Sequence, residues 1–140
     1  MAYLDTSLLA AYYCPEPLST AVQKAILETA SPTISPLVEI EFCSAVALKV
    51  RTREFDGATA NKVVSLFRLH VTDHRYAIVP IEAREYDLAR EWIGRFAVPL
   101  RALDALHLAA AFANDLTLLT TDKPLARCAQ QFGVKHRLIS

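Results

Sequence analysis

The sequence predicts an α/β fold in which a short parallel sheet is flanked by helices. Short apolar runs at residues 2–5, 33–35, 76–80 and 116–120 alternate with longer segments whose apolar residues recur at the 3.6-residue period of a helix. The run at 116–120, Leu-Thr-Leu-Leu-Thr, is almost continuously apolar, which is typical of a parallel strand covered on both faces. Strands and helices that alternate in this way form parallel sheets with right-handed crossovers.

The first half of the chain is predicted to contain two strands and four helices. Thr6 and Ser7 follow the first strand as candidate N-caps of a short helix. Pro15 and Pro17 interrupt the chain before a second helix, and Pro36 suits the first turn of a third. The expected elements are a strand at 2–5, a helix through 8–12, a helix at 18–30, a strand at 33–35 and a helical hairpin at 37–72 that Asp56 and Gly57 interrupt.

The second half continues the alternation. Leu103, Leu106 and Ala110 share one helix face, which supports a helix after Pro99. The expected elements are a strand at 76–80, a helix at 82–95, a helix after Pro99, a strand at 116–120, a helix at 124–132 and a last strand near 136–139. Ligands in such sheets bind beyond the carboxyl ends of the strands, so residues that directly follow strands are the first candidates for a site.

The length and composition of the chain predict a single domain that covers residues 1–140. The chain is 53% hydrophobic and 21% charged, and no stretch reads as a linker. Its longest uncharged apolar runs are far shorter than a membrane span, and its N-terminus lacks the basic region of a secretory signal. We therefore expect a cytoplasmic protein with no membrane contact. Cys14, Cys43 and Cys128 are widely spaced among apolar neighbours, which favours buried thiols over disulfides or a zinc site.

Four carboxylates stand out from the other acids. Asp5 and Asp122 lie at the carboxyl ends of predicted strands, where each also suits a helix N-cap. Glu41 and Asp104 lie on apolar faces of predicted helices, where a carboxylate is costly unless it is paired or bound to a metal. A local ion pair of Asp104 with Arg101 is the alternative explanation for that residue.

The predicted fold gathers these four acids at one edge of the sheet. Like charges in one cleft raise each other's pKa, so such a cluster is typical of a divalent cation site. Oxygen ligands without cysteine or paired histidine suit Mg²⁺ or Mn²⁺, and ions of this kind activate water for phosphodiester hydrolysis. The formal net charge is zero, but four acids neutralised by metal leave the remaining surface mildly basic. His107 can orient a carboxylate, contact substrate or simply be a core residue.

Four motifs in this order resemble those of PIN-domain nucleases. They are Asp5-Thr6-Ser7 after the first strand, Glu41 within Ser35–Phe42, Asp104 within Leu103–Leu108, and Thr120-Thr121-Asp122. The resemblance covers essentially the whole chain and is strongest to the small stand-alone toxins of VapBC-type toxin–antitoxin modules. It implies a three-layer PIN-like fold and a Mg²⁺- or Mn²⁺-dependent endoribonuclease that cleaves cellular RNA and arrests translation and growth.

The resemblance also implies roles and partners. Asp5, Glu41, Asp104 and Asp122 would hold the metal and activate water, and Ser7 and Thr120 would support them by hydrogen bonds. Strand alternation relative to Asp122 favours Thr120 over Thr121. The same likeness suggests a homodimer and a small antitoxin whose tail blocks the cleft.

RNA binding needs cations as well as a metal. Arg95 and Arg101 flank Asp104 and are the candidates for phosphate contacts, whereas Lys49, Arg51 and Arg53 can equally be a solvated helix end. The sequence is compatible with one or two metal ions and with DNA as a further substrate, since both polymers share the phosphate.

Two alternatives differ in class. The first is a non-enzymatic interaction scaffold with a PIN-like fold, which usually lacks one or more of the acids. The second is a Mg²⁺-dependent haloacid-dehalogenase-like phosphatase, which needs a second Asp two residues after the first, where this chain has Ser7.

Overall fold

Five strands and seven helices alternate along residues 1–140, all of which the computed structural model describes. The first half contains β1 (Ala2–Leu4), α1 (Thr6–Tyr13), α2 (Ser19–Leu27), β2 (Pro32–Ile34), α3 (Pro36–Arg51) and α4 (Gly57–Thr72). The second half contains β3 (Ala77–Ile78), α5 (Ala83–Ile93), α6 (Ala102–Ala113), β4 (Thr117–Thr120), α7 (Lys123–Gln131) and β5 (His136–Leu138). The expected order of elements is confirmed throughout, and the ends differ by a few residues.

The strands form one parallel sheet in the order β3-β2-β1-β4-β5. Tyr3 pairs with Thr33 of β2 on one side and with Leu118 of β4 on the other. From β1 the chain proceeds outward to β2 and β3, and it later returns to place β4 and β5 on the opposite side. The strand order therefore reverses between β1 and β4, and this is the point at which open α/β sheets form a crevice at their carboxyl ends.

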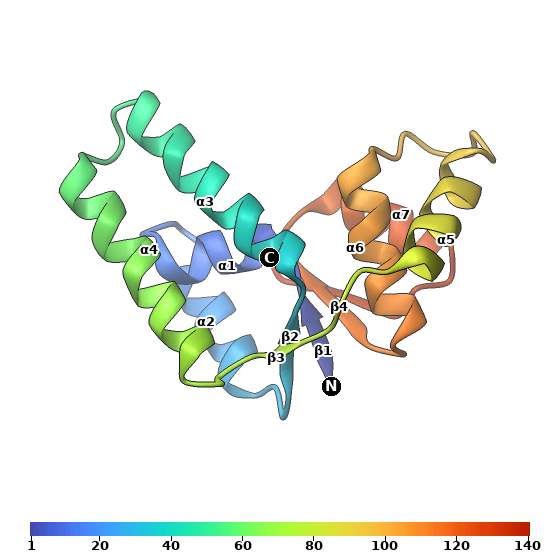
Figure 1. Cartoon of the computed structure of the whole chain (residues 1–140), viewed down its shortest axis with the longest axis horizontal. Helices are drawn as coiled ribbons and strands as arrows, with labels where there is room; N and C mark the ends of the chain where they lie inside the picture. The colour runs from blue at the N-terminus through green and yellow to red at the C-terminus, as the bar shows by residue number, and fades with distance from the viewer.

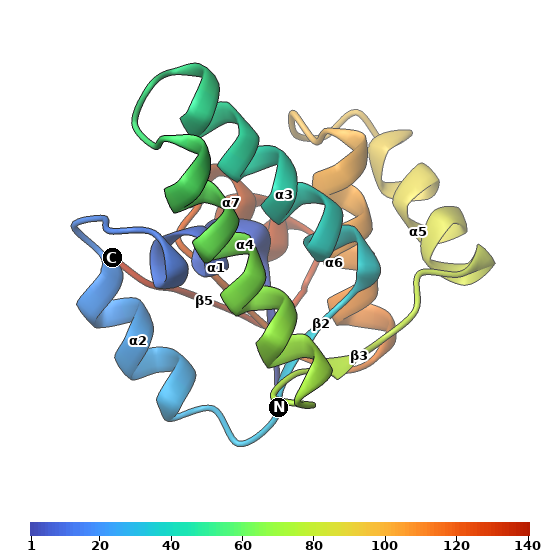
Figure 2. The same ribbon diagram turned by 60° about the vertical axis from the view of Figure 1, so that its left-hand side comes forward.

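Helices cover the sheet on both sides. The α3–α4 hairpin stands on one side of the strands and α5 and α6 on the other, as Figure 1 shows. In the turned view of Figure 2 the hairpin comes forward and α1 lies behind it. This arrangement confirms the expected α/β architecture of a short parallel sheet between helical layers.

Helix α6 is buried on nearly every side. Residues Ala105–Ala111 are all buried, because α6 lies between the sheet and α5. The small alanine side chains allow the helix to lie close to both neighbours. His107 is the one polar residue in this buried run, so its two ring nitrogens need partners inside the protein.

The cysteines differ from expectation at one position. Cys14 and Cys128 are buried free thiols, as predicted, whereas Cys43 is exposed. Its neighbour Phe42 is one of three buried residues of α3, with Val38 and Val46, and Cys43 is turned one helical step away from it. None of the seven helices combines the length and apolar character needed to cross a membrane.

Candidate active site at the ends of β1 and β4

Asp5 ends β1 and is held by protein donors on both carboxylate oxygens. It is the N-cap of α1, and its Oδ1 accepts the backbone N–H of Leu8 at 3.0 Å. Ser7 Oγ lies 2.8 Å and 3.0 Å from the two carboxylate oxygens, and Thr120 Oγ1 donates to Oδ2 at 2.7 Å. Burial raises the pKa of the Asp5 carboxyl above its usual value, although hydrogen bonds from Thr120, Ser7 and Leu8 oppose that shift.

Asp122 occupies the matching position after β4. It is the N-cap of α7, and its Oδ1 accepts the backbone N–H of Leu125 at 3.2 Å. Its own backbone N–H donates to Thr120 Oγ1 at 3.0 Å. Thr120 is thus bonded to both strand-end acids, whereas Thr121 takes part through its backbone N–H, which donates to Ser7 Oγ at 3.2 Å. The capping explanation for Asp5 and Asp122 is correct, and Thr120 also links the carboxylate of Asp5 to the backbone of Asp122.

Glu41 faces the same region from α3. Its Oε1 accepts a hydrogen bond from Thr6 Oγ1 at 2.8 Å and another from Nε2 of His107. Burial by itself raises the pKa of Glu41, but the hydrogen bonds from His107 and Thr6 bring it below its usual value. Glu41 is therefore held as a carboxylate.

Asp104, in the first turn of α6, has few protein partners. Its nearest cation is the guanidinium of Arg101, whose Nε lies 3.7 Å from Oδ2. Burial raises the pKa of Asp104, and the negative charges of Asp122 and Glu41 raise it further, while Arg101 opposes them. A pocket of about 290 Å³ is lined by Glu41, Asp104 and Arg101. Asp104, Glu41 and Asp122 therefore interact electrostatically, although they come from separate elements.

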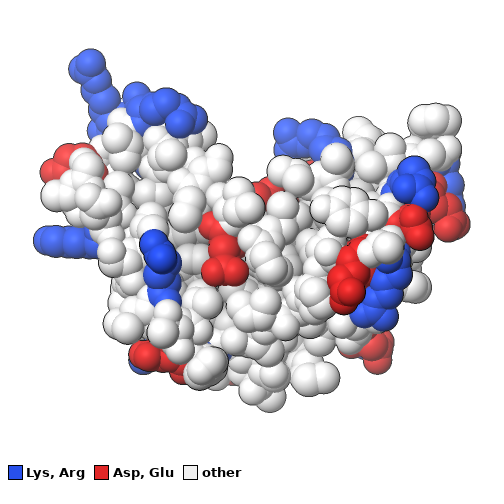
Figure 3. All heavy atoms as spheres, in the orientation of Figure 1, with Lys and Arg blue, Asp and Glu red and all other residues white.

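Charged side chains are spread over this face of the molecule. Figure 3 shows Asp and Glu side chains in the middle of the face and further ones on both helical arms, where they lie among Lys and Arg side chains.

The profile of the PIN domain family matches residues 2–130. The chain belongs to the PIN domain family. This confirms the family that the four motifs resembled.

Solved PIN domain structures superpose on most of the chain. FitAcB from Neisseria gonorrhoeae gives a TM-score of 0.71 at 19% identity, over 97% of this chain and 96% of that chain. The sarcin-ricin loop cleaving toxin VapC20 of Mycobacterium tuberculosis gives 0.71 at 17%, over 91% and 94%. DNA-bound VapBC from Salmonella typhimurium gives 0.73 at 13%, over 100% of both chains. These similarities show the same fold. Comparison with curated proteins gave no match.

The donor set of this PIN domain suits a hard divalent cation in its chemistry, since all four candidate ligands are carboxylates. No three Asp, Glu, His or Cys side chains are placed to hold one ion as they stand. Three of the acids accept hydrogen bonds from protein groups, namely Asp5, Glu41 and Asp122. Some of the candidate ligands must therefore move closer together for a complete ligand set to form.

The two candidate phosphate-binding arginines occupy different surroundings. Arg101 lines the pocket with a side chain that is 90% exposed. Arg95 lies beyond the end of α5, where its Nη2 is 2.6 Å from Glu91 Oε1. Arg101 is thus near the acids, whereas Arg95 is engaged in an ion pair outside the pocket.

His107 is the residue whose importance the sequence did not reveal. It is 2% exposed, and it bonds Glu41 through Nε2 and the hydroxyl of Tyr3 through Nδ1 at 2.7 Å. The available signal was its position three residues after Asp104 in a run that is otherwise apolar. That pattern equally describes an ordinary core histidine, so the sequence left both interpretations open.

Proposed function

We propose that this PIN domain is a divalent-metal-dependent endoribonuclease that acts as the toxin of a toxin–antitoxin pair. The observation that carries the proposal is the electrostatic coupling of Asp104 to Glu41 and Asp122. Thr120 in turn links Asp122 to Asp5 at the ends of β1 and β4, where the strand order reverses. The family match and the similarity to VapC20, which cleaves the sarcin-ricin loop, support the RNA substrate.

The proposed ion is Mg²⁺ or Mn²⁺, with Asp5, Glu41, Asp104 and Asp122 as its candidate ligands. When bound, such an ion supplies a water of lowered pKa and an electrophile for the scissile phosphate. The chain's own contributions are distinct. Ser7 and Thr120 orient Asp5, and Thr6 donates to Glu41. Arg101 is placed to contact a substrate phosphate beside Asp104.

Asp104 is proposed as the acid that depends most on the metal. The other three accept hydrogen bonds from protein donors, whereas Asp104 has only a distant guanidinium and two negative neighbours. A cation in the pocket relieves this repulsion directly. Binding of the ion and turning of Asp122 toward it are expected to occur together.

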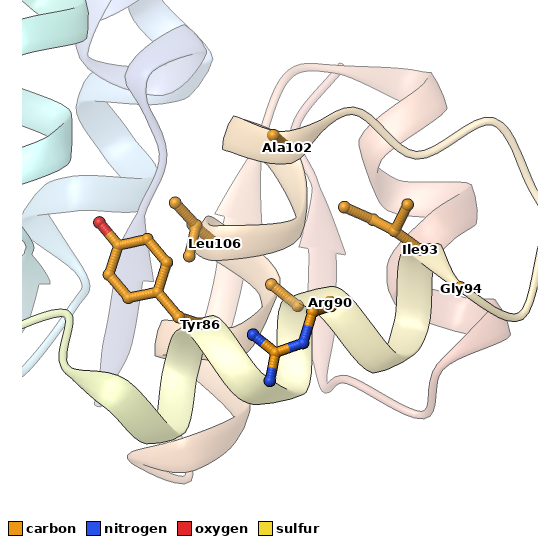
Figure 4. A pocket seen from close by; sticks show the side chains of 7 residues that line it. Tyr86, Arg90, Ile93, Gly94, Ala102 and Leu106 are labelled. Atoms are coloured by element: carbon orange, nitrogen blue, oxygen red, sulfur yellow. The ribbon is translucent and has the colours of Figure 1, made fainter.

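A small antitoxin is the proposed partner. An apolar groove of about 420 Å³ lies between α5 and α6, lined by residues that include Tyr86, Ile93 and Leu106, as Figure 4 shows. Tyr86 and Leu106 also line an adjoining pocket with Ile40 of α3. An apolar antitoxin segment in this groove would approach the acidic pocket, since Ala102 lines both. Several solved structures of this fold are toxin–antitoxin complexes, which supports the assignment.

A homodimer is also proposed. Two copies would place two acidic crevices in one particle, as suits a long polyanionic substrate. Sedimentation of the purified protein over a range of concentrations is expected to give twice the mass of 15.5 kDa. A single species of monomer mass at tens of micromolar would contradict the dimer without bearing on the nuclease.

The decisive experiment sequences the 5′ ends of RNA fragments after induced expression. We expect arrested growth and new 5′ ends at a defined site, and purified protein is expected to cut the same site only with Mg²⁺ or Mn²⁺. Asp104→Asn should abolish both effects, because it removes a charged ligand. The triple variant Asp5→Ala, Asp104→Ala, Asp122→Ala should no longer arrest growth. If it arrests growth as strongly as wild type, the nuclease mechanism is wrong. Antitoxin binding without RNA cleavage would identify the non-enzymatic scaffold instead.

A further inference from the structure

A buried chain of hydrogen-bonded side chains runs from the sheet to Glu41. Ser35 Oγ lies 2.7 Å from the hydroxyl of Tyr3, and that hydroxyl lies 2.7 Å from Nδ1 of His107. Nε2 of His107 then bonds Oε1 of Glu41. Ser35 and Tyr3 are fully buried, and His107 is 2% exposed. Water therefore has little access to these groups, and each depends on the others for its hydrogen bonds.

The direction of the bonds follows from the chemistry of the end groups. The Glu41 carboxylate has no proton to donate, so Nε2 of His107 carries the hydrogen. In the neutral imidazole Nδ1 is then an acceptor, and it takes the hydrogen of the Tyr3 hydroxyl. Burial raises the pKa of Tyr3, which keeps that hydroxyl protonated. Ser35 in turn donates to the Tyr3 oxygen. Every donor in the chain thus points toward Glu41.

Only one oxygen of Glu41 is occupied by this arrangement. Thr6 and His107 both bond Oε1, and Oε2 has no protein hydrogen-bond partner. Glu41 lines the same pocket as Asp104. Two donors that converge on one oxygen fix the plane and direction of the carboxylate, and they leave the other oxygen available to a ligand in the pocket.

A purely structural role does not account for these residues well. The other buried positions of α6 are alanine and leucine, so the helix packs against the sheet through apolar contacts. A histidine in the same run introduces two polar nitrogens that must both be satisfied. The hydroxyl of Tyr3 bonds one of these nitrogens, and the other nitrogen bonds Glu41, a candidate metal ligand.

We propose that His107, oriented by Tyr3, is a positioning residue that fixes Glu41 through one carboxylate oxygen so that the other is free to bind the metal. The proposal rests on the proposed function, because it assigns a task to residues behind that site. It adds Tyr3, Ser35 and His107, none of which is expected to touch the ion or the RNA.

Two substitutions at His107 separate the orientation of Glu41 from packing. A glutamine amide reaches the position of Nε2 and can still donate to Glu41, whereas an asparagine amide reaches only the position of Nδ1. We expect His107→Gln to bind Mn²⁺ within about 3-fold of wild type and His107→Asn to bind it about 10- to 100-fold more weakly, the range seen when partners of metal ligands are removed. Calorimetric titration with Mn²⁺ alone measures this without RNA.

Tyr3→Phe provides a second variant that keeps the ring in the core and removes only the hydroxyl. It is expected to weaken Mn²⁺ binding in the same direction and to change the nitrogen-15 shift of His107 Nδ1 in the metal-free protein. In RNA cleavage, His107→Asn should lower kcat while KM changes little, because no substrate contact is removed.

The outcomes separate this proposal from the proposed function. A wild-type protein that binds no Mn²⁺ and cleaves no RNA overturns the proposed function. Equal Mn²⁺ affinity of wild type, His107→Gln, His107→Asn and Tyr3→Phe overturns the positioning role alone. The positioning role is also overturned if His107→Gln and His107→Asn lose the same Mn²⁺ affinity and these losses scale with their losses of Tm. Such a result would identify His107 as a packing residue.

Discussion

Thr120 Oγ1 donates a 2.7 Å hydrogen bond to Asp5 Oδ2 and so joins the carboxyl ends of two adjacent strands. The same hydroxyl oxygen accepts the backbone N–H of Asp122 at 3.0 Å. One threonine therefore sets the distance between two acids that are far apart in sequence. Because Thr120 is fully buried, no solvent molecule replaces it readily.

Replacing Thr120 by valine is expected to destabilise the fold and to weaken metal binding. Valine keeps the shape but leaves the Asp5 carboxylate and the Asp122 N–H each short of one partner, at a cost of about 1–3 kcal/mol in the free energy of unfolding. Urea denaturation measures the loss. Thr121→Val is the matched control, since only the backbone of Thr121 bonds in the site, and it should change stability by less than about 0.5 kcal/mol. Equal effects of the two substitutions would contradict the role of Thr120.

Asp104→Asn is expected to abolish metal binding without loss of stability. Burial and the charges of Asp122 and Glu41 disfavour the ionised form of Asp104 in the folded protein, so a neutral amide relieves a cost. We expect a Tm equal to or above that of the metal-free wild type. Added Mn²⁺ should raise the Tm of wild type and leave that of the variant unchanged. Asp87→Asn, at an exposed position of α5, is the control, and its Tm should still rise on addition of Mn²⁺. A marked fall in the Tm of Asp104→Asn would refute this account.

The stability of metal-free wild type relative to Asp104→Asn is expected to depend on pH. The pKa of Asp104 is raised above its ordinary value of 3.8, so its unfolded form loses the proton first as the pH rises. Wild type therefore loses stability relative to the variant as the pH climbs above 3.8 and through the folded pKa, and the two agree at lower pH. Urea unfolding of both proteins at several pH values from 3 to 7 measures the difference. A difference that grows as the pH falls would have the wrong sign.

Arg101→Gln is expected to weaken RNA binding more than Arg95→Gln. Arg101 lines the acidic pocket and its side chain is largely exposed, whereas Arg95 is paired with Glu91. Loss of one phosphate contact should reduce the slope of log affinity against log salt by about 1. Both arginine substitutions are made in the catalytically inactive Asp104→Asn protein, and the binding of each to labelled RNA is measured at several salt concentrations. The idea fails if both arginine variants show the wild-type slope.

Tyr86→Lys is expected to weaken the antitoxin complex and to leave metal binding intact. Tyr86 is 54% exposed at the edge of the groove between α5 and α6, so lysine is tolerated by the fold but is unsuited to an apolar partner segment. We expect the dissociation constant for the co-expressed antitoxin to rise at least about tenfold. Leu27→Lys changes an exposed apolar residue on α2, outside the groove, and serves as the control. An unchanged constant for Tyr86→Lys would remove this groove from the interface.

Much of the fold was predictable because its signals are local. Strand ends, proline positions and helix periodicity each depend on a few neighbouring residues. Asp5 and Asp122 stood out because they follow apolar strands. Glu41 and Asp104 stood out because a carboxylate on an apolar helix face is costly unless it is paired or bound to a metal. The exposure of Cys43 was not predictable, since neighbouring positions on a helix differ by about 100° and packing decides which of them face the core.

The sequence by itself determined the order of elements, the four candidate acids and the family, because these follow from local pattern and motif order. Only the tertiary structure decided which donors hold each acid. His107 meets Tyr3 across 104 positions of sequence and Glu41 across 66, and both contacts depend on how α6 packs against the sheet and where α3 lies. Hydrogen bonds require heavy atoms within about 3 Å and a defined direction, and no local pattern specifies either.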